Sequence, residues 1–296
     1  MHSILKRFKY KHTLKNILIF LPFFFDLENI NLTQIKLFLI SFIGFIILTN
    51  TIYFINDYSD YEIDKLNKLK EKYIVKKNYL LLISFLLGLL LFFYIFYFEN
   101  FYNYCITLYI VNFILYNYLF KRIFFLDLVF LTNFYIIRIL YGFELYDNLE
   151  ISYYFLTFIF LFFISLAACK RLVQVHVNDL DTSNKIIKYS NKNYFFLKKI
   201  ANISLFSSAI FYLIFLLNLF TEKKVFGNFI YQDKTFDKIS YLLISILFVI
   251  LFSILFKVIN LKIPSVDIFD FTITNKSVII ICLIIMSYCF YIAMNT

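Results

Sequence analysis

The sequence predicts an all-α, polytopic membrane protein with nine transmembrane helices. Three features support this: the composition, the length of the apolar runs and the charges of the loops. Of 296 residues, 62% are hydrophobic and only 16% are charged, whereas a soluble domain carries about 25% charged residues. Apolar runs of about 20 residues, the length that crosses the hydrocarbon core as a helix, recur along the chain.

The apolar runs divide the chain into nine expected spans. They cover residues 13–26, 34–55, 79–98, 101–120, 123–143, 152–169, 200–220, 239–257 and 277–294. The first is short and contains Pro22, so we expect it to be tilted or partly embedded. No segment between spans has the composition of a soluble domain, and residues 1–296 are therefore expected to form one transmembrane domain.

The loops between these spans alternate in charge. The basic set comprises the N-terminal segment, residues 56–78, Lys121–Arg122, residues 170–199 and the segment around Lys257 and Lys262. The other set is acidic around Asp26, Glu99 and Glu144, and of mixed charge at 221–238. Because cytoplasmic loops carry an excess of Lys and Arg, this pattern predicts a cytoplasmic N-terminus and an external C-terminus.

The end of the second expected span is acidic. It reads Asn56-Asp57-Tyr58-Ser59-Asp60-Tyr61-Glu62-Ile63-Asp64. On a continuous helix Asp57, Asp60 and Asp64 share one face, and Asn56 lies one turn before Asp60. Stacked carboxylates repel, and Mg²⁺, which prefers oxygen ligands and substrate phosphates, relieves that repulsion. The alternative is a solvated helix end without a metal.

This motif, Asn56-Asp57-x-x-Asp60-x-x-x-Asp64 after the second of nine spans, resembles the first aspartate-rich motif of the UbiA superfamily of intramembrane prenyltransferases. The resemblance implies a UbiA-like helical bundle in which these four residues hold Mg²⁺ on a substrate diphosphate. It also assigns catalytic roles to Asp57, Asp60 and Asp64. Lys70 and Lys72 lie where family members place basic residues near the diphosphate.

The second acidic motif of ordinary UbiA enzymes is absent in its usual form. These enzymes carry Asp-x-x-x-Asp after the sixth span, whereas this chain has Asn178-Asp179-Leu180-Asp181. Asp179 and Asp181 point apart on a helix. They form either a second acidic site or a turn and helix cap.

Three further features resemble the decaprenyl-phosphate phosphoribosyltransferase branch of the superfamily. They are Lys15-Asn16 at the start of the first span, Arg138 inside the fifth span, and the pair Lys170-Arg171. The chain departs from that branch at Thr13, where Trp is common, and at Tyr73, near the place of a proline.

The chemistry of these cations agrees with phosphate binding. A charged residue inside the membrane is expensive, and arginine suits bidentate phosphate contacts. A phosphoribosyltransferase must hold three phosphate groups, so Lys15, Asn16, Arg138, Lys170 and Arg171 are candidates for that role. Alternatively, Arg138 forms a structural ion pair or binds helix carbonyls, and Lys15 extends to the interface.

We therefore expect an Mg²⁺-dependent transferase that moves 5-phosphoribosyl from phosphoribosyl diphosphate to a polyprenyl phosphate. One alternative is transfer of a polyprenyl group to an aromatic acceptor such as 4-hydroxybenzoate. Another is a transporter, although the Gly- and Pro-interrupted helices common in transporters are not evident. The expected partners are a polyprenyl lipid, a diphosphate-bearing co-substrate and the bilayer, without nucleic acid. The expected location is a bacterial inner membrane, with the active site on the cytoplasmic side.

Overall fold

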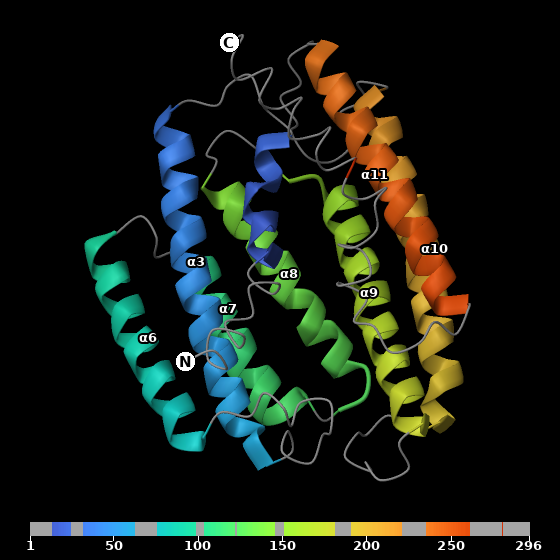
Figure 1. Cartoon of the computed structure of the whole chain (residues 1–296). Helices are drawn as coiled ribbons and strands as arrows, with labels where there is room; N and C mark the ends of the chain where they lie inside the picture. Colours follow the sequence, from blue (N-terminus) through green and yellow to red (C-terminus); the bar gives the residue numbers. More distant parts are fainter. Residues whose placement is uncertain are drawn as a thin grey trace.

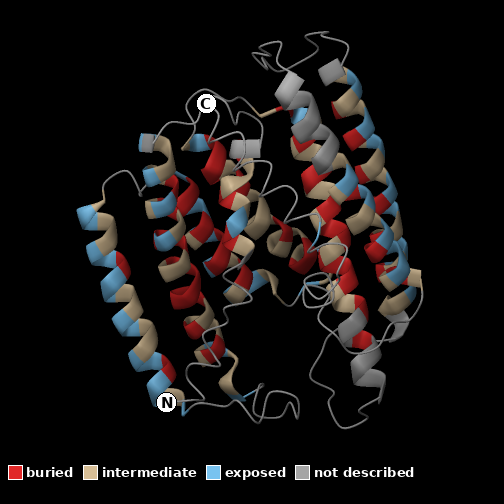
Figure 2. Cartoon of the chain, turned by 45° about the horizontal axis from the view of Figure 1, so that its top comes forward, coloured by how far each residue is buried: buried red, intermediate tan, exposed pale blue. Residues whose placement is uncertain are grey.

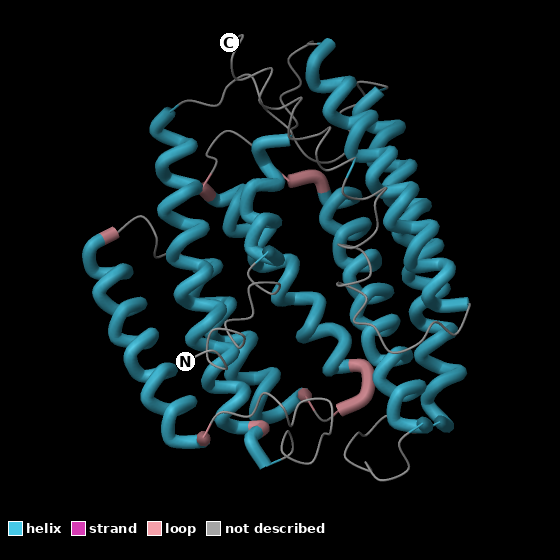
Figure 3. Tube along the Cα trace, viewed as in Figure 1, coloured by secondary structure: helices cyan, strands magenta, loops and turns pink. Residues whose placement is uncertain are grey.

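The computed structural model describes residues 14–24, 32–62, 76–98, 104–121, 123–145, 151–180, 191–220, 235–260 and 280, with some side chains near helix ends not described. Within these residues every regular element is a helix, and none is a strand (Figure 3). The all-α prediction is therefore confirmed for the described part of the chain.

The elements follow the expected spans closely. In chain order they are η1 (Leu14–Phe24), α3 (Leu32–Ser59), α6 (Lys77–Tyr97), α7 (Tyr104–Leu115), η4 (Tyr116–Phe120), α8 (Leu126–Glu144), α9 (Tyr153–Leu180), α10 (Asn191–Phe220) and α11 (Thr235–Asn260). The first eight expected spans each overlap one of these helices or, for 101–120, α7 and η4 together; α9 extends beyond the expected end at 169, and α10 begins before the expected start at 200. The ninth, at 277–294, lies outside the described residues except for Ile280.

Within the part of the chain that the structure describes, five helices are long and apolar enough to cross a membrane. These are α3, α6, α8, α9 and α10, while Tyr104–Phe120 and Ser245–Asn260 form shorter apolar helices. Large apolar side chains such as Phe93 and Phe96 on α6 are exposed, as expected for a helix that faces lipid tails. The chain is a multi-pass integral membrane protein.

The first expected span is a 3₁₀ helix. η1 has 11 residues, and at about 2.0 Å per residue it covers about 22 Å, less than the roughly 30 Å hydrocarbon core. It packs against α8 and α3. At Gly142 on α8, an added Cβ would lie 2.2 Å from the carbonyl oxygen of Ile19. Glycine is therefore required for this close approach.

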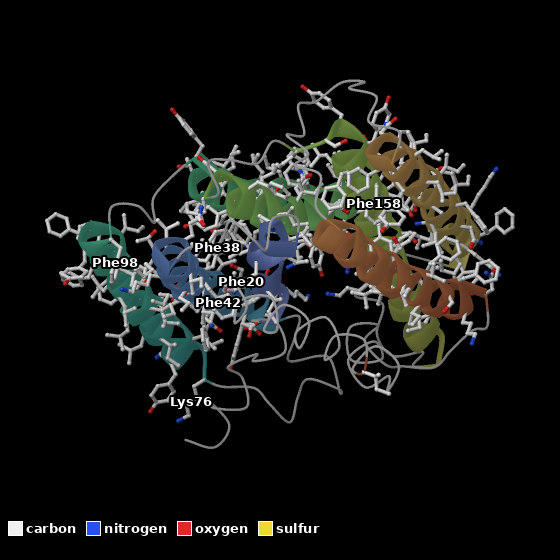
Figure 4. The ribbon with its side chains drawn as sticks, turned by 90° about the horizontal axis from the view of Figure 1, so that it is seen from above. Phe20, Phe38, Phe42, Lys76, Phe98 and Phe158 are labelled. Atoms are coloured by element: carbon white, nitrogen blue, oxygen red, sulfur yellow. The ribbon has the colours of Figure 1, made fainter. Side chains whose placement is uncertain are left out.

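Aromatic packing holds the other side of η1. The Phe20 ring lies 5.9 Å from that of Phe38 and 5.3 Å from that of Phe42, both on α3. Figure 4 shows these three labelled rings together between α3 and η1. η1 is thus fixed between two helices.

The remaining helices form two groups, and most of the buried apolar residues described lie in two large cores. α9 packs along α10 and contacts α11, whereas α3 packs against α6; α8 is tilted and contacts η1, α7 and α9 (Figure 1). One core lies among α8, α9, α10 and α11, and a second among η1, α3, α6, α7 and α8; a small third cluster joins Phe54 on α3 to Leu80 on α6. α6 has few buried residues, whereas α3, α8 and α9 have many (Figure 2).

This arrangement brings several helix ends together. The C-terminal end of α3, η4, the first turn of α8, the C-terminal part of α9 and the start of α10 all lie toward one end of the bundle (Figure 1). We call this the motif end, because Asn56, Asp57 and Asp60 lie there on or just after α3. Basic residues of the expected cytoplasmic loops, including Lys121 and Arg171, lie toward the same end.

Candidate active site

At the motif end, oxygen atoms of Asn56 and Asp60 converge on one cation, the ammonium of Lys121. The Asp60 amide donates to the carbonyl of Asn56 (2.9 Å), so Asp60 keeps the helical register just beyond α3. Nδ2 of Asn56 donates to Oδ2 of Asp60 (3.1 Å). Nζ of Lys121 donates to Oδ1 of Asn56 (3.2 Å) and forms an ion pair with Oδ2 of Asp60.

A distortion at the end of α7 positions Lys121. Residues Tyr116–Phe120 form the π-helix η4, and the Lys121 amide donates to the Tyr116 carbonyl, five residues back (2.8 Å). Nδ2 of Asn117 donates to Oγ of Ser59 (3.4 Å), which ties η4 to the end of α3. π-Turns of this kind are frequent at functional sites.

The other predicted acidic residues are only partly described. Asp57 is 6% exposed and lies on the last turns of α3. Asp64 lies outside the described residues, as do Lys70 and Lys72. Within the described residues, no group of three His, Cys, Asp or Glu side chains is arranged to hold a metal. The described half of the motif nevertheless fits Mg²⁺, because a carboxylate and an amide oxygen already meet at a cationic group.

A buried ion pair lies beside this site. Nε and Nη2 of Arg171 on α9 donate to the two carboxylate oxygens of Asp127 on α8, both at 2.5 Å. The hydroxyl of Tyr116 donates to Oδ1 of Asp127 (3.1 Å). Asp127 is fully buried in the first turn of α8, where the helix dipole favours a negative charge. The guanidinium of Arg171 is therefore engaged by protein, while Lys170 beside it is half-buried.

Arg138 forms a second polar centre, deeper in the bundle. It lies eleven positions after Asp127, about 16 Å further along α8. Its side chain is 1% exposed. Nε donates to Oδ1 of Asn16 (2.8 Å), Nη1 to the carbonyl of Phe134 (2.6 Å) and Nη2 to the hydroxyl of Tyr109 (2.6 Å).

The residues around Arg138 connect η1 to three helices. Nδ2 of Asn16 donates to Oγ1 of Thr49 on α3 (3.2 Å), and Nζ of Lys15 lies 5.6 Å from the centre of the Tyr135 ring on α8. In the described part of the chain, all hydrogen-bond acceptors of Arg138 are neutral. The helix-carbonyl alternative considered for Arg138 is therefore observed at Phe134, together with side-chain contacts that the sequence did not indicate.

The described residues that were predicted to bind phosphate thus fall into two separate groups. Arg171 lies near the motif end with Lys170, whereas Lys15, Asn16 and Arg138 lie together deeper in the bundle. The second acidic segment is not described, since the side chain of Asp179 and the whole of Asp181 lie outside the described part. A role for these residues in substrate binding remains a prediction.

Two residues at the motif end were missed by the sequence reasoning. Asp127 carried a usable signal: it is an acid within an apolar run, and such acids usually have a cationic partner. Lys121 carried a weaker one, as one of many loop lysines. Its contact with Asp60 spans 61 residues of sequence, so no local pattern reveals it.

Comparison with known proteins gives a match in structure only. No family model matches the chain, and no curated protein matches it. Among solved structures the chain is similar to a UbiA homolog from Archaeoglobus fulgidus bound to GPP and Mg²⁺, with 14% sequence identity and a TM-score of 0.65. The alignment covers 98% of this chain and 99% of that one. Along nearly its whole length, this chain therefore has the fold of a UbiA homolog.

Proposed function

We propose that the protein is an Mg²⁺-dependent transferase of the UbiA type that acts on a polyprenyl lipid and releases diphosphate. The observation that carries this proposal is the convergence of Asn56 and Asp60 oxygens on one cationic group at the end of α3. The bound ligands of the similar UbiA homolog, GPP and Mg²⁺, are a prenyl diphosphate and a divalent metal, which supports the same chemistry here.

Different residues of the site would bind the metal and the diphosphate of the donor. Asn56, Asp57, Asp60 and Asp64 would hold Mg²⁺, which when bound neutralises charge on a departing diphosphate. The hydrogen bond from Asn56 to Asp60 fixes the carboxylate relative to the amide oxygen. Lys121 supplies a positive charge within reach of the same diphosphate. We propose that residues 1–296 form a single transmembrane domain around this site.

The orientation follows from the distribution of charge. Lys121 and Arg171 lie toward the motif end, and the positive-inside rule places such residues in the cytoplasm. We infer a cytoplasmic N-terminus and a site that opens to the cytoplasm, in a bacterial inner membrane. A water-soluble donor would reach the site from that side, and the lipid would reach it from the bilayer.

The first candidate reaction is transfer of 5-phosphoribosyl to a polyprenyl phosphate. A phosphate oxygen of the lipid attacks the anomeric carbon of phosphoribosyl diphosphate, and the bond to the diphosphate breaks. The lipid phosphate is already ionised, so no strong general base is needed. The contact of Lys121 with Asp60 and Asn56 supports this candidate, because the reactants carry three phosphate groups that need cationic partners; we propose Lys170 as a further partner.

The second candidate is transfer of a polyprenyl group from its diphosphate to an aromatic acceptor such as 4-hydroxybenzoate. The observation that favours it is the GPP bound to the similar UbiA homolog. In this reaction the ring carbon attacks the prenyl carbon, diphosphate leaves, and a ring proton is lost to water. The same acidic motif serves both candidates.

Labelled substrates distinguish the two candidate reactions. Purified protein in nanodiscs would receive either phosphoribosyl diphosphate with a polyprenyl phosphate, or a polyprenyl diphosphate with 4-hydroxybenzoate, each with Mg²⁺ or with EDTA. Labelled lipid in the first mixture alone supports phosphoribosyl transfer, and product in the second alone supports prenylation. If protein that is shown to be folded converts neither mixture, both candidate reactions are contradicted and a transporter is favoured.

A further inference from the structure

Lys121 occupies the position where the proposed site needs a metal. Its ammonium contacts Oδ1 of Asn56 at 3.2 Å and pairs with Oδ2 of Asp60. These are two of the oxygens that the motif would offer to Mg²⁺. An ammonium in close contact with a carboxylate oxygen weakens the binding of a divalent cation to the same oxygen, because the two positive charges repel.

The Lys121 side chain is able to leave. Its exposed fraction is 27% and that of Asp60 is 19%, so the pair is partly open to solvent. A lysine carries its charge on a flexible four-carbon stem with three donors, so it can change partners without a movement of η4. When it leaves Asp60, it needs another anion near the same point.

A substrate diphosphate is that anion. It would arrive bound to the metal that displaces Lys121, and its oxygens would lie within reach of the released ammonium. The metal and the diphosphate therefore assist one another: the metal frees Lys121, and the diphosphate gives it a new partner.

We propose that Lys121 is an internal counter-ion that neutralises Asp60 until a diphosphate arrives, so that metal and diphosphate bind cooperatively. This inference rests on the proposed function, since it assumes that the motif binds a metal. It predicts that the wild-type protein binds a divalent metal weakly by itself and more tightly with diphosphate. Coupling between two ligands is commonly 5–150-fold.

Mn²⁺ binding, followed by electron paramagnetic resonance, tests this without turnover. The full-length protein in nanodiscs is titrated with Mn²⁺ alone and with inorganic diphosphate, and the complex that forms in buffer is measured separately. For the wild type we expect diphosphate to increase the affinity for Mn²⁺ on the order of tenfold or more. For Lys121→Gln we expect tighter binding of Mn²⁺ alone and a smaller effect of diphosphate.

Lys77→Gln is the matched control. Lys77 opens α6 near the end of α3, but its ammonium lies over the ring of Tyr58, 5.1 Å from the ring centre. The substitution removes the same charge from the same region without touching Asp60. We expect the Lys77→Gln protein to keep the wild-type affinity for Mn²⁺ and the wild-type effect of diphosphate.

The outcomes separate this inference from the function on which it rests. Equal Mn²⁺ affinity in the wild type with and without diphosphate would overturn the role of Lys121, whether or not the variant folds. Equal affinities of the wild type and Lys121→Gln for Mn²⁺ would also overturn it, as would equal changes in affinity in Lys121→Gln and Lys77→Gln. In each of these cases the proposed metal site would remain supported. No bound Mn²⁺ under any condition would overturn both.

Discussion

Asp127 and Arg171 join α8 to α9 through two parallel hydrogen bonds, each 2.5 Å long. Asp127 lies in the first turn of α8, directly after the segment that carries Lys121. Phe125, two residues before Asp127, has a φ of 69°, which is unusual for a residue with a side chain. The pair therefore anchors the chain where it reverses from η4 into α8, and indirectly holds Lys121 beside Asp60.

Breaking this pair should destabilise the protein strongly. Asp127→Asn or Arg171→Gln leaves one charge without its partner in a buried place, at a cost of about 3–5 kcal/mol. Unfolding of the purified protein in detergent, followed by circular dichroism, measures the loss. The double variant Asp127→Leu/Arg171→Met should recover much of the stability, because an apolar pair has no unpaired charge. If the double variant loses as much stability as the two single variants together, the pair does not stabilise the protein in this way.

The sequence predicted the helices because their signal is local. A run of about 20 apolar residues has few alternatives to a membrane-spanning helix, and the expected spans at 34–55, 79–98 and 123–143 match α3, α6 and α8. The 3₁₀ form of η1 was not predictable in this way. η1 is in close contact with α8 where Ile19 meets Gly142, and a contact between residues so far apart in the sequence leaves no local pattern.

The candidate site was predictable to the extent that its contacts are local. Helical spacing placed Asn56 beside Asp60, and the structure confirms that they are hydrogen-bonded. The contacts of Lys121 with Asp60 and of Arg138 with Asn16 join distant segments. For this reason Arg138 was predicted only as a candidate for phosphate binding, and Lys121 was missed. Both arginines predicted to bind substrate phosphate have protein partners in the structure.

Gly142 should be essential for the position of η1. In Gly142→Ala the new methyl group would lie 2.2 Å from the Ile19 carbonyl oxygen and 3.1 Å from Cδ of Pro22. η1 must then move away, and we expect a loss of about 1–3 kcal/mol in stability, as for other overpacked sites. Gly88→Ala on α6 is the control, because nothing lies within 4 Å of its added Cβ. A helical glycine-to-alanine change there should be neutral or stabilising. Thermal unfolding of the two variants gives the comparison, and equal melting temperatures would show that η1 tolerates displacement.

The Arg138 centre should depend on the shape of the guanidinium as well as on its charge. Arg138→Lys keeps the charge but cannot reach Asn16, Phe134 and Tyr109 from one nitrogen in the observed directions. A hydrogen bond to a charged group contributes about 1.5–3 kcal/mol, so Arg138→Lys should lose at least that much stability.

Asn16→Ala tests whether this loss arises at the contact with η1. If it does, the double variant Asn16→Ala/Arg138→Lys should be less destabilised than the sum of the single variants, because both remove the same bond. Thermal unfolding of the four proteins completes the cycle. If the losses of stability in the two single variants add up strictly in the double variant, Arg138 stabilises the fold without the help of Asn16.

Asp60 and Glu62 provide the sharpest comparison at the motif end, since they are two residues apart and both acidic. Asp60 meets Asn56 and Lys121, whereas Glu62 is exposed. Asp60→Asn removes a charge that would hold the metal against the leaving diphosphate, and losing such stabilisation of developing charge typically lowers turnover on the order of hundredfold or more. Glu62→Gln removes the same charge from the surface and should leave turnover close to wild type.

Initial rates with whichever labelled substrate pair is active, measured over a range of Mg²⁺ concentrations, distinguish Asp60→Asn from Glu62→Gln. Asp60→Asn should also require more Mg²⁺ for half-maximal rate. If the two variants have the same rates and the same Mg²⁺ dependence, the end of α3 contributes only surface charge and the metal must be bound elsewhere.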